Sequence, residues 1–132
     1  MDRYYQHVRI KANWTTALAY ASTMRFGGLI GHLLTVTSTA EHNFVNTTVR
    51  RLGQQVWIGA SDTLTEGSFV WVDGPEKDSA VPTSFWATGE PSTGASGNSN
   101  DCACYNTSGE WKDHACANLL EFIVEFERKS KF

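Results

Sequence analysis

The first part of the chain has the apolar spacing of a strand followed by a helix. Residues 3–10 are aromatic and β-branched enough to form a short opening strand. Asn13 is a typical helix N-cap, and apolar residues recur at helical spacing from Trp14 to Ala21. The glycine pair at positions 27–28 can end this helix in a left-handed turn. We therefore expect one strand and a first helix in this region.

A second helix is predicted after a short strand at LLTVT, residues 33–37. Ser38, with Glu41 three residues later, forms a capping box that marks the start of this helix. A glycine at position 53 closes it. The apolar stripe of the predicted helix consists of Phe44, Val45, Val49 and Leu52.

The middle of the chain has the composition of strands and then of a long loop. VWIGAS (residues 56–61) and SFVWVDG (residues 68–74) are strand-like runs joined by turn residues, so we expect a hairpin. Residues 73–100 contain all 3 prolines and no periodic run. A long irregular segment inside a compact domain is usually functional or disordered.

The chain returns to strand at DCACYN and ends on LLEFIVEFE, residues 119–127. In this last run three apolar residues alternate with Ile123, Glu125 and Glu127, as in a strand with two different faces. Helices come early, strands dominate late, and both termini can be strands. The predicted fold class is therefore α+β with a mostly antiparallel sheet.

Composition and charge limit the possible partners. The 132 residues are 41% hydrophobic and 19% charged, which fits one folded domain with its own core. The net charge of -3 offers no surface for a polyanion, so we do not expect a nucleic acid partner. No stretch approaches the ~20 apolar residues of a membrane span, so direct membrane insertion is not expected. The first residues, MDRYYQHVRI, start directly on domain-like sequence, and we expect residues 1–132 to be a single domain excised from a longer protein.

The cysteines Cys102, Cys104 and Cys116 are odd in number, so one is left over if two pair. With His114 they give four zinc-competent side chains within fifteen positions. The C-x-C spacing is tighter than the usual separation of zinc ligands, which argues against this alternative. The other histidines, at positions 7, 32 and 42, are scattered and are expected to be solvated or core residues.

Taken in order, these motifs resemble a C-type lectin-like domain along almost the whole chain. The supporting segments are NWTTALAYASTMRFGGLIGHLLTVTSTAEHNFV, VWIGASD, EGSFVWVDG, FWATGEPS, DCACYNTSGEWKDHAC and FIVEFE. The resemblance implies that the terminal strands pair and that two helices flank a mostly antiparallel sheet. It also implies that the long irregular loop forms a protruding lobe.

The resemblance also implies a calcium and ligand site at the ends of the long loop. The triplet that begins at Glu90 is Glu-Pro-Ser where calcium-binding members have Glu-Pro-Asn, and it is closer to the mannose type than to the galactose type. The triplet that ends at Asp113 is Trp-Lys-Asp where they have Trp-Asn-Asp. Asn100 matches the acidic residue before the second core cysteine, so Glu90, Asn100 and Asp113 are the expected calcium ligands. The expected ligand-binding set consists of Glu90, Ser92, Asn100, Lys112 and Asp113.

Two departures from this pattern weaken the predicted metal site. Ser92 is a poor substitute for an amide ligand. An ammonium at the Lys112 position, about 4 Å from the ion, would repel it by roughly 8 kcal/mol at an effective dielectric of 20. That repulsion exceeds the ~4 kcal/mol of a millimolar site, so we expect weak or absent calcium binding. In a second outcome, the Lys112 amine neutralises Glu90 and Asp113 and holds the loop without metal.

The resemblance assigns roles to the cysteines and to one proline. Cys102 and Cys116 match the inner disulfide of the family, which leaves Cys104 as a buried, unpaired small hydrophobe. The outer disulfide is absent, and its two positions are occupied by Ala21 and Val124, where an apolar contact can replace it. The proline that follows Glu90 is commonly cis in the family. Most of the five tryptophans are expected in the core, and Trp86 is the one least readily assigned to it.

The predicted function is non-catalytic recognition of a ligand by the loop of residues 73–113. The expected ligand is a glycan, and the alternative is a calcium-independent protein-interaction or adhesion domain that uses the same surface. No nucleophile and base stand at motif spacing, so we do not expect an enzyme, and no organic cofactor is expected. The resemblance places the domain outside the cell or at its surface, as part of a larger protein.

Overall fold

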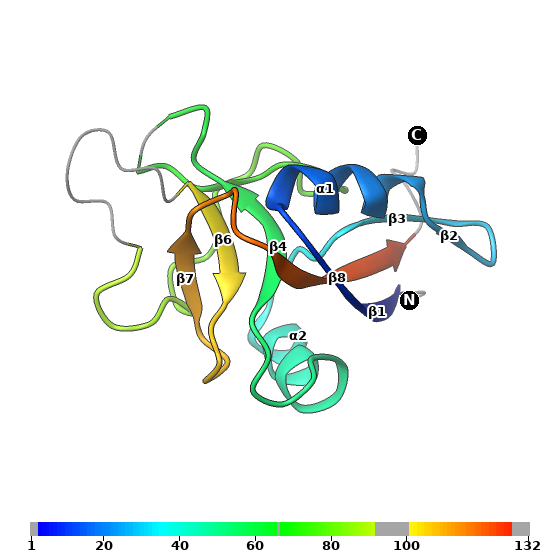
Figure 1. The fold of residues 1–132 in the computed structure, drawn as a ribbon, viewed down its shortest axis with the longest axis horizontal. Helices are drawn as coiled ribbons and strands as arrows, with labels where there is room; N and C mark the ends of the chain where they lie inside the picture. Colours follow the sequence, from blue (N-terminus) through cyan, green and yellow to red (C-terminus); the bar gives the residue numbers. More distant parts are fainter. Residues whose placement is uncertain (1–2, 66, 92–100, 128–132) are drawn as a thin grey trace.

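The computed structural model describes residues 3–65, 67–91 and 101–127. The strands in this part of the chain are β1 (Arg3–Ala12), β2 (Arg25–Phe26), β3 (Leu29–Leu33), β4 (Val56–Ser61), β5 (Val70–Trp71), β6 (Cys102–Tyr105), β7 (Trp111–His114) and β8 (Leu120–Glu127). They form one sheet in the order β2-β3-β8-β4-β6-β7, with β1 on β8 and β5 on β4 (Figure 1). Helices α1 (Trp14–Thr23) and α2 (Thr39–Phe44) lie on opposite sides of β8 in Figure 1.

Strand β8 connects the parts of the sheet because it pairs with β1, β3 and β4. β1 is antiparallel to it, with Arg3 opposite Glu127 and Val8 opposite Phe122. β3 is also antiparallel to β8, whereas β4 is parallel to it. The α+β class and the mostly antiparallel sheet are confirmed, and the strands nearest the two termini pair with each other.

Helix α1 begins as predicted but ends earlier. The Asn13 side chain accepts a hydrogen bond from the Thr16 backbone N–H and caps the helix. The helix ends at Thr23, so the prediction that the glycine pair ends it was wrong. Gly27 and Gly28, with φ of 55° and 85°, form the two-residue turn between β2 and β3. A hairpin turn of this kind needs positive φ at both positions, and glycine adopts it without strain.

The second helix is shorter than its predicted apolar stripe. Ser38 caps α2 by accepting a hydrogen bond from the Glu41 N–H, as predicted. A π-helical turn, η1 (Val45–Val49), continues α2 and ends before the predicted glycine. Val45 is fully buried, but Phe44 is 44% exposed and Leu52 is 91% exposed. The stripe prediction was therefore wrong at these two positions, because the chain leaves the helix before Leu52 can face the core.

The predicted strand at residues 33–37 was also misplaced. β3 ends at Leu33, and the following residues run between β8 and β4 without forming a ladder. Leu34 still links the two strands, since its N–H donates to Ile123 and its carbonyl accepts from Gly59. Regular pairing stops at Thr35, whose N–H donates to the Glu125 side chain at 3.1 Å.

The core has two buried clusters, on the two faces of β8. Phe122 and Val124 pack with α1 in one cluster, whereas Ile123 packs with Trp71 and Trp111 in the other. The buried tryptophans are Trp14, Trp57, Trp71 and Trp111. Trp86 is only partly buried and packs against its cluster from outside, as the sequence analysis expected.

A close approach replaces the outer disulfide of the family. Ala21 on α1 and Val124 on β8 are both fully buried in the same cluster. A Cβ at Gly31 would lie 2.6 Å from the Ala21 carbonyl oxygen and 3.1 Å from Val124 Cγ1. The glycine therefore lets helix and sheet pack directly, and apolar contact takes the place of the cross-link.

The inner disulfide is present between Cys102 and Cys116. It leaves no thiolate at these two positions, so the zinc alternative of the sequence analysis loses two of its four ligands. Cys104 is free and buried, and burial raises the pKa of its thiol to about 12. Cys104 is therefore an inert core residue rather than a reactive one.

Removing the disulfide with the double substitution C102A/C116A is expected to lower the free energy of unfolding by about 3 kcal/mol, because the bond closes a loop of roughly 15 residues. Urea unfolding at neutral pH measures this loss. The matched control is Cys104→Ala, which removes one sulfur from the same buried cluster and keeps the bond. Equal losses in the two proteins would mean that packing, not the cross-link, carries the effect.

Candidate ligand-binding site

Asp113 is held on the inner face of β7. β7 pairs with β6, with Ala103 opposite Asp113, and the Cys102–Cys116 bond ties the start of β6 to the segment after β7. Burial alternates along β7, so that Asp113 is only 4% exposed while Lys112 is half-buried. Asp113 and Lys112 therefore lie on opposite faces of the strand.

The segment before the long loop brings Glu90 to the same place. The Trp111 backbone N–H donates to the Phe85 carbonyl at 2.8 Å, and the Trp111 carbonyl accepts from the Ala87 N–H at 2.9 Å. The chain then turns, because the Glu90 N–H donates to the Ala87 carbonyl at 2.9 Å. Because the segment before Glu90 bonds to Trp111, the first residue of β7, Glu90 lies close to Asp113.

The carboxyl groups of Glu90 and Asp113 meet although they are far apart in sequence. The Asp113 backbone N–H donates to Glu90 Oε1 at 3.4 Å. Burial and a hydrogen bond to the Asp113 carboxyl raise the pKa of Glu90, while that N–H and the Lys112 charge oppose the shift without cancelling it. Two carboxyl groups in this arrangement share either a proton or a cation.

The structure describes only some of the other predicted site residues. The peptide bond between Glu90 and Pro91 is cis, as the resemblance implied. Ser92 and Asn100 lie outside the described residues. Lys112 lies on the opposite face of β7 from Asp113, so its side chain leaves the strand away from the Asp113 carboxyl group.

The carboxylates of Glu90 and Asp113 are ligands that calcium prefers, but they are too few to complete its coordination. Calcium takes six to eight oxygen ligands, and carboxylates are among those it prefers. Glu90 and Asp113 together have four carboxylate oxygens. A calcium ion at this position would need further oxygens from the rest of the loop, from a ligand or from water.

Comparison with known proteins decides the family. The family profile described as "Lectin C-type domain" matches residues 11–126. The chain belongs to the C-type lectin domain family. Hepatic lectin of Gallus gallus is 33% identical over 123 residues, which cover 93% of this chain and 54% of that protein. The low affinity immunoglobulin epsilon Fc receptor of Mus musculus is 37% identical over 96 residues, or 73% of this chain and 27% of the receptor. The C-type lectin domain thus spans about half, or less, of these relatives.

Solved structures agree on the fold. The carbohydrate-recognition domain of the mouse scavenger receptor C-type lectin superposes with a TM-score of 0.81 at 27% identity, covering 98% of this chain and 93% of that one. The lectin CEL-I of Cucumaria echinata has the same TM-score at 26% identity, with the same coverage. A calcium-independent type II antifreeze protein has a TM-score of 0.74 at 21% identity, which shows the fold alone.

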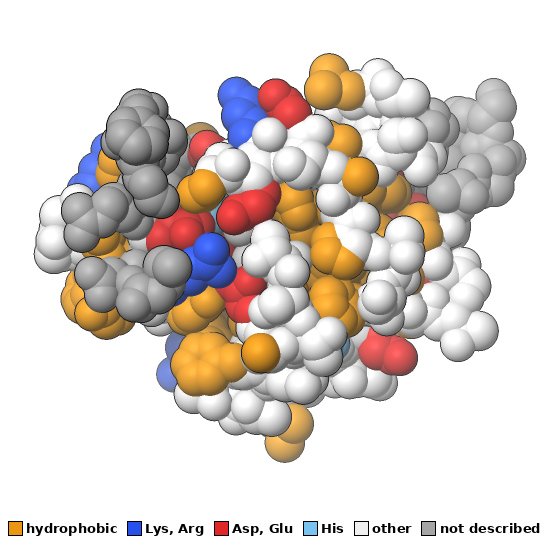
Figure 2. All heavy atoms as spheres, turned by 180° about the vertical axis from the view of Figure 1, so that it is seen from behind, with side chains coloured by type: hydrophobic (Ala, Val, Ile, Leu, Met, Phe, Trp, Pro, Cys, Tyr) orange, Lys and Arg blue, Asp and Glu red, His pale blue; other side chains and the backbone are white. Residues whose placement is uncertain are grey.

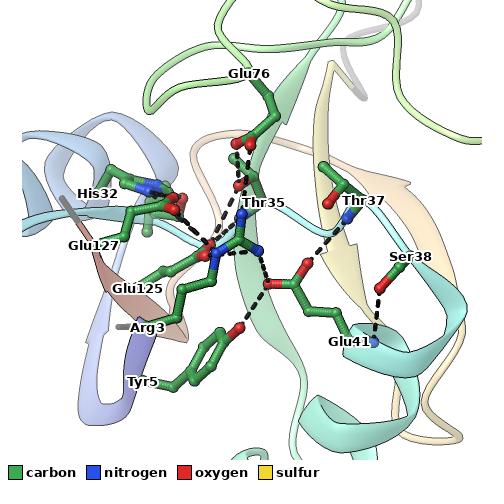
Figure 3. A network of polar contacts seen from close by, with 11 residues as sticks. Arg3, Tyr5, His32, Thr35, Thr37, Ser38, Glu41, Glu76, Glu125 and Glu127 are labelled. Carbon is green, nitrogen blue, oxygen red and sulfur yellow. Dashed lines mark hydrogen bonds and ion pairs between the residues drawn. The ribbon is translucent and has the colours of Figure 1, made fainter. Parts of the chain in front are cut away.

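A polar cluster that the sequence analysis missed lies on the buried side of β8 in this C-type lectin domain (Figure 3). Arg3 Nη1 lies 3.3 Å from Glu41 and 3.7 Å from Glu125, and Arg3 Nε lies 3.1 Å from Glu127. His32 Nε2 lies 2.7 Å from a Glu127 oxygen. Figure 2 shows acidic and basic side chains gathered on the side of the molecule where β1 and β8 lie in Figure 1. Arg3 therefore links carboxylates from two separate segments, α2 and β8.

Charges within this cluster depend on one another. Burial raises the pKa of Glu125 to about 8, although the charge of His32 opposes the rise. Burial lowers the pKa of His32, but the hydrogen bond to Glu127 and the charge of Glu125 raise it to about 9. His32 is therefore favoured in its protonated, positively charged form at neutral pH.

The sequence indicated that the two glutamates of this cluster share a face of the strand, but it did not indicate that they are buried. Glu125 and Glu127 share one parity of the last strand with Ile123, so they were expected on a common face. Their burial was not predictable, because an alternating polar face normally meets solvent. His32 was expected to be a solvated or core histidine, and only the pairing of β3 with β8 brings it to Glu127.

Replacing Glu90 by Gln is expected to stabilise the metal-free domain at neutral pH, by up to about 1 kcal/mol for a solvent-screened contact. The pKa of Glu90 is raised in the folded state, so the stability that its proton provides is present at acid pH. That stability is lost as the pH rises through the raised value. Gln keeps a donor for Asp113 at every pH. Thermal unfolding in EDTA from pH 4 to 8 measures the difference.

The control for this substitution is Glu110→Gln, since Glu110 is an exposed residue just before β7. Its stability is expected to follow the wild type across the pH range. A Glu90→Gln protein that is no more stable than the wild type at pH 8 would contradict the shared-proton arrangement.

Proposed function

We propose that this C-type lectin domain is a non-catalytic recognition module that binds a glycan at the rim where Glu90 and Asp113 meet, with weak calcium dependence. The observation that supports this most directly is the contact between Glu90 and Asp113, one on each side of the long loop. A relative named hepatic lectin and a neighbour named as a carbohydrate-recognition domain support the same class of ligand.

The geometry suggests how a cation would act at this rim. Asp113 is fixed by β7 and by the disulfide, and Glu90 by the backbone bonds to Trp111, so both carboxyl groups are preorganised. Ionised together they repel each other, and a divalent cation in the place of the shared proton removes that repulsion. When bound, calcium supplies further coordination positions, to which pairs of sugar hydroxyls can bind.

Calcium dependence is expected to be weak for two reasons. Of the predicted calcium ligands, Glu90 and Asp113 are the two among the described residues, and the predicted ligand Ser92 offers a hydroxyl where an amide would bind better. The charge of Lys112 reaches Glu90 and would also repel a cation there. A site of this kind corresponds to a dissociation constant on the order of 1 mM or weaker.

The disulfide and the relatives support the proposed cellular location. A disulfide such as Cys102–Cys116 persists in oxidising environments, which supports a domain that works outside the cell or at its surface. One curated relative is named as an Fc receptor, in which the matched region is 27% of the protein. Among the described residues, no helix is long and apolar enough to cross a bilayer. Because the matched relatives are longer than this domain, we propose that it acts as one part of a larger protein.

Calorimetry with calcium and a mannoside tests this proposal. The wild type is expected to bind calcium with a dissociation constant on the order of 1 mM, and the mannoside only when calcium is present. Asp113→Asn removes one of the two charges and is expected to abolish both signals. Glu110→Gln, exposed beside β7, is the matched control and should behave as the wild type.

The outcomes separate the two classes of binding module. Mannoside binding that persists in EDTA would mean recognition without calcium. The absence of binding to calcium, to mannosides and to a broad set of glycans would overturn the carbohydrate proposal. A protein ligand whose binding is lost in Asp113→Asn would then favour the calcium-independent interaction domain.

A further inference from the structure

A second group of metal-compatible side chains lies at the other end of the sheet. His32, Glu125 and Glu127 are all buried, and a ligand atom from each lies within 4.8 Å of the others. In Figure 1 this end of β8 and β3 lies on the opposite side of the molecule from β7, which carries Asp113. We infer that His32, Glu125 and Glu127 form a zinc site that is separate from the proposed glycan site.

The hydrogen bonds of His32 leave its Nε2 as the metal-facing atom. Nδ1 lies 2.6 Å from the Leu33 carbonyl oxygen, which can only accept, so Nδ1 must carry a hydrogen. Nε2 lies 2.7 Å from Glu127 Oε2. This is the length of a hydrogen bond, so a proton lies between the two atoms in the metal-free domain. A zinc ion would replace that proton, with the two atoms slightly farther apart. Metal-binding histidines usually donate their other ring N–H to a carbonyl or carboxylate, as His32 does.

His7 provides an internal comparison because it also contacts a glutamate. Its Nδ1 accepts a hydrogen bond from the Arg51 backbone N–H at 3.0 Å, so Nε2 carries the hydrogen. Nε2 then donates to Glu121 Oε1 at 2.6 Å. Neutral His7 therefore has a partner at each ring nitrogen, and Arg51 Nη1 lies 3.5 Å from the same Glu121 oxygen.

The two carboxylates are oriented by Arg3. Its Nε lies 3.1 Å from Glu127 Oε1, and its Nη1 lies 3.7 Å from Glu125 Oε2. Glu127 Oε2 and Glu125 Oε1 are then left on the side of His32, at 2.7 and 4.0 Å from Nε2. The Glu125 side chain is fully buried, and its Oε2 has no hydrogen-bond partner among the described residues. That oxygen faces Arg3, whereas Oε1, on the His32 side, accepts from the Thr35 N–H at 3.1 Å and lies 3.2 Å from the Thr35 hydroxyl.

The site is open to solvent on one side. A cavity of about 470 Å³ is lined by His32 and Glu127 together with Asp73 and Gly74. A Cβ at Gly74 would lie 2.8 Å from His32 Cε1, so the glycine lets the backbone pack against the imidazole and fix its position. The cavity gives an ion a route of entry and room for a water molecule as a fourth ligand.

The ligand types favour zinc over calcium. Zinc accepts imidazole nitrogen and carboxylate oxygen in four-coordinate sites, whereas calcium prefers six to eight oxygens. One nitrogen, two carboxylates and one water complete a tetrahedral set. Arg3 lies on the side of Glu127 Oε1 and Glu125 Oε2, so only two carboxylate oxygens face His32, fewer than calcium takes.

Calorimetric titration of the EDTA-treated, dialysed domain with zinc chloride tests the site. One zinc ion per chain is expected, and calcium chloride should give no heat at this site. His32→Gln is expected to weaken zinc binding by at least roughly tenfold. The matched control His7→Gln removes a histidine from the other glutamate pair and should leave zinc binding unchanged. Asp113→Asn, which tests the glycan site, should also leave it unchanged.

A crystal of the wild type soaked in zinc chloride provides a readout that no variant can confound. An anomalous peak at the zinc edge is expected within bonding distance of His32 Nε2. The inference would be overturned if zinc at 1 mM, a concentration that corresponds to roughly 4 kcal/mol of binding free energy, gave no heat. An anomalous peak at His7 or His114 with none at His32 would also overturn it. Equal zinc affinity in folded His32→Gln and wild type would do the same.

Discussion

The burial of both faces of β8 is the constraint on which the rest of the structure depends. One face carries Phe122, Val124 and Phe126 into the cluster beneath α1. The other carries two glutamates, Glu125 and Glu127, into the interior. An uncompensated buried charge costs several kcal/mol, more than one well-packed apolar side chain contributes. The strands beside β8 must therefore bring matching polar groups, and Arg3 from β1 and His32 from β3 do so.

The same strand determines where the proposed ligand-binding site lies. β4 runs parallel to β8, β6 pairs with β4, and β7 pairs with β6, so the position of Asp113 is set by a series of ladders that begins at β8. Glu90 follows because the backbone of Phe85 and Ala87 bonds to Trp111. The site is thus carried by the rigid sheet edge, although half of it comes from a segment without regular structure.

Local features of the fold were predictable from sequence, whereas features that depend on distant partners were not. The Asn13 and Ser38 caps are local hydrogen bonds, and both were found where the sequence placed them. The glycine pair at positions 27–28 was misassigned because a helix end and a hairpin turn need the same positive φ. Glu90 and Asp113 were paired in advance only through the family resemblance. Nothing local in the sequence indicates that His32 meets Glu127.

The negative charges of the two carboxylate pairs in this domain are compensated in different ways. Glu90 and Asp113 meet beside the long loop, where a proton or an oxygen-seeking ion from solution can compensate their charge. Glu125 and Glu127 lie deep in the fold, where Arg3 and His32 compensate their charge. An ion that took the place of the His32 proton would meet an imidazole nitrogen, which favours a different class of ion. Because oxygen-only and nitrogen-containing donor sets prefer different metals, calcium and zinc would not compete for the two positions.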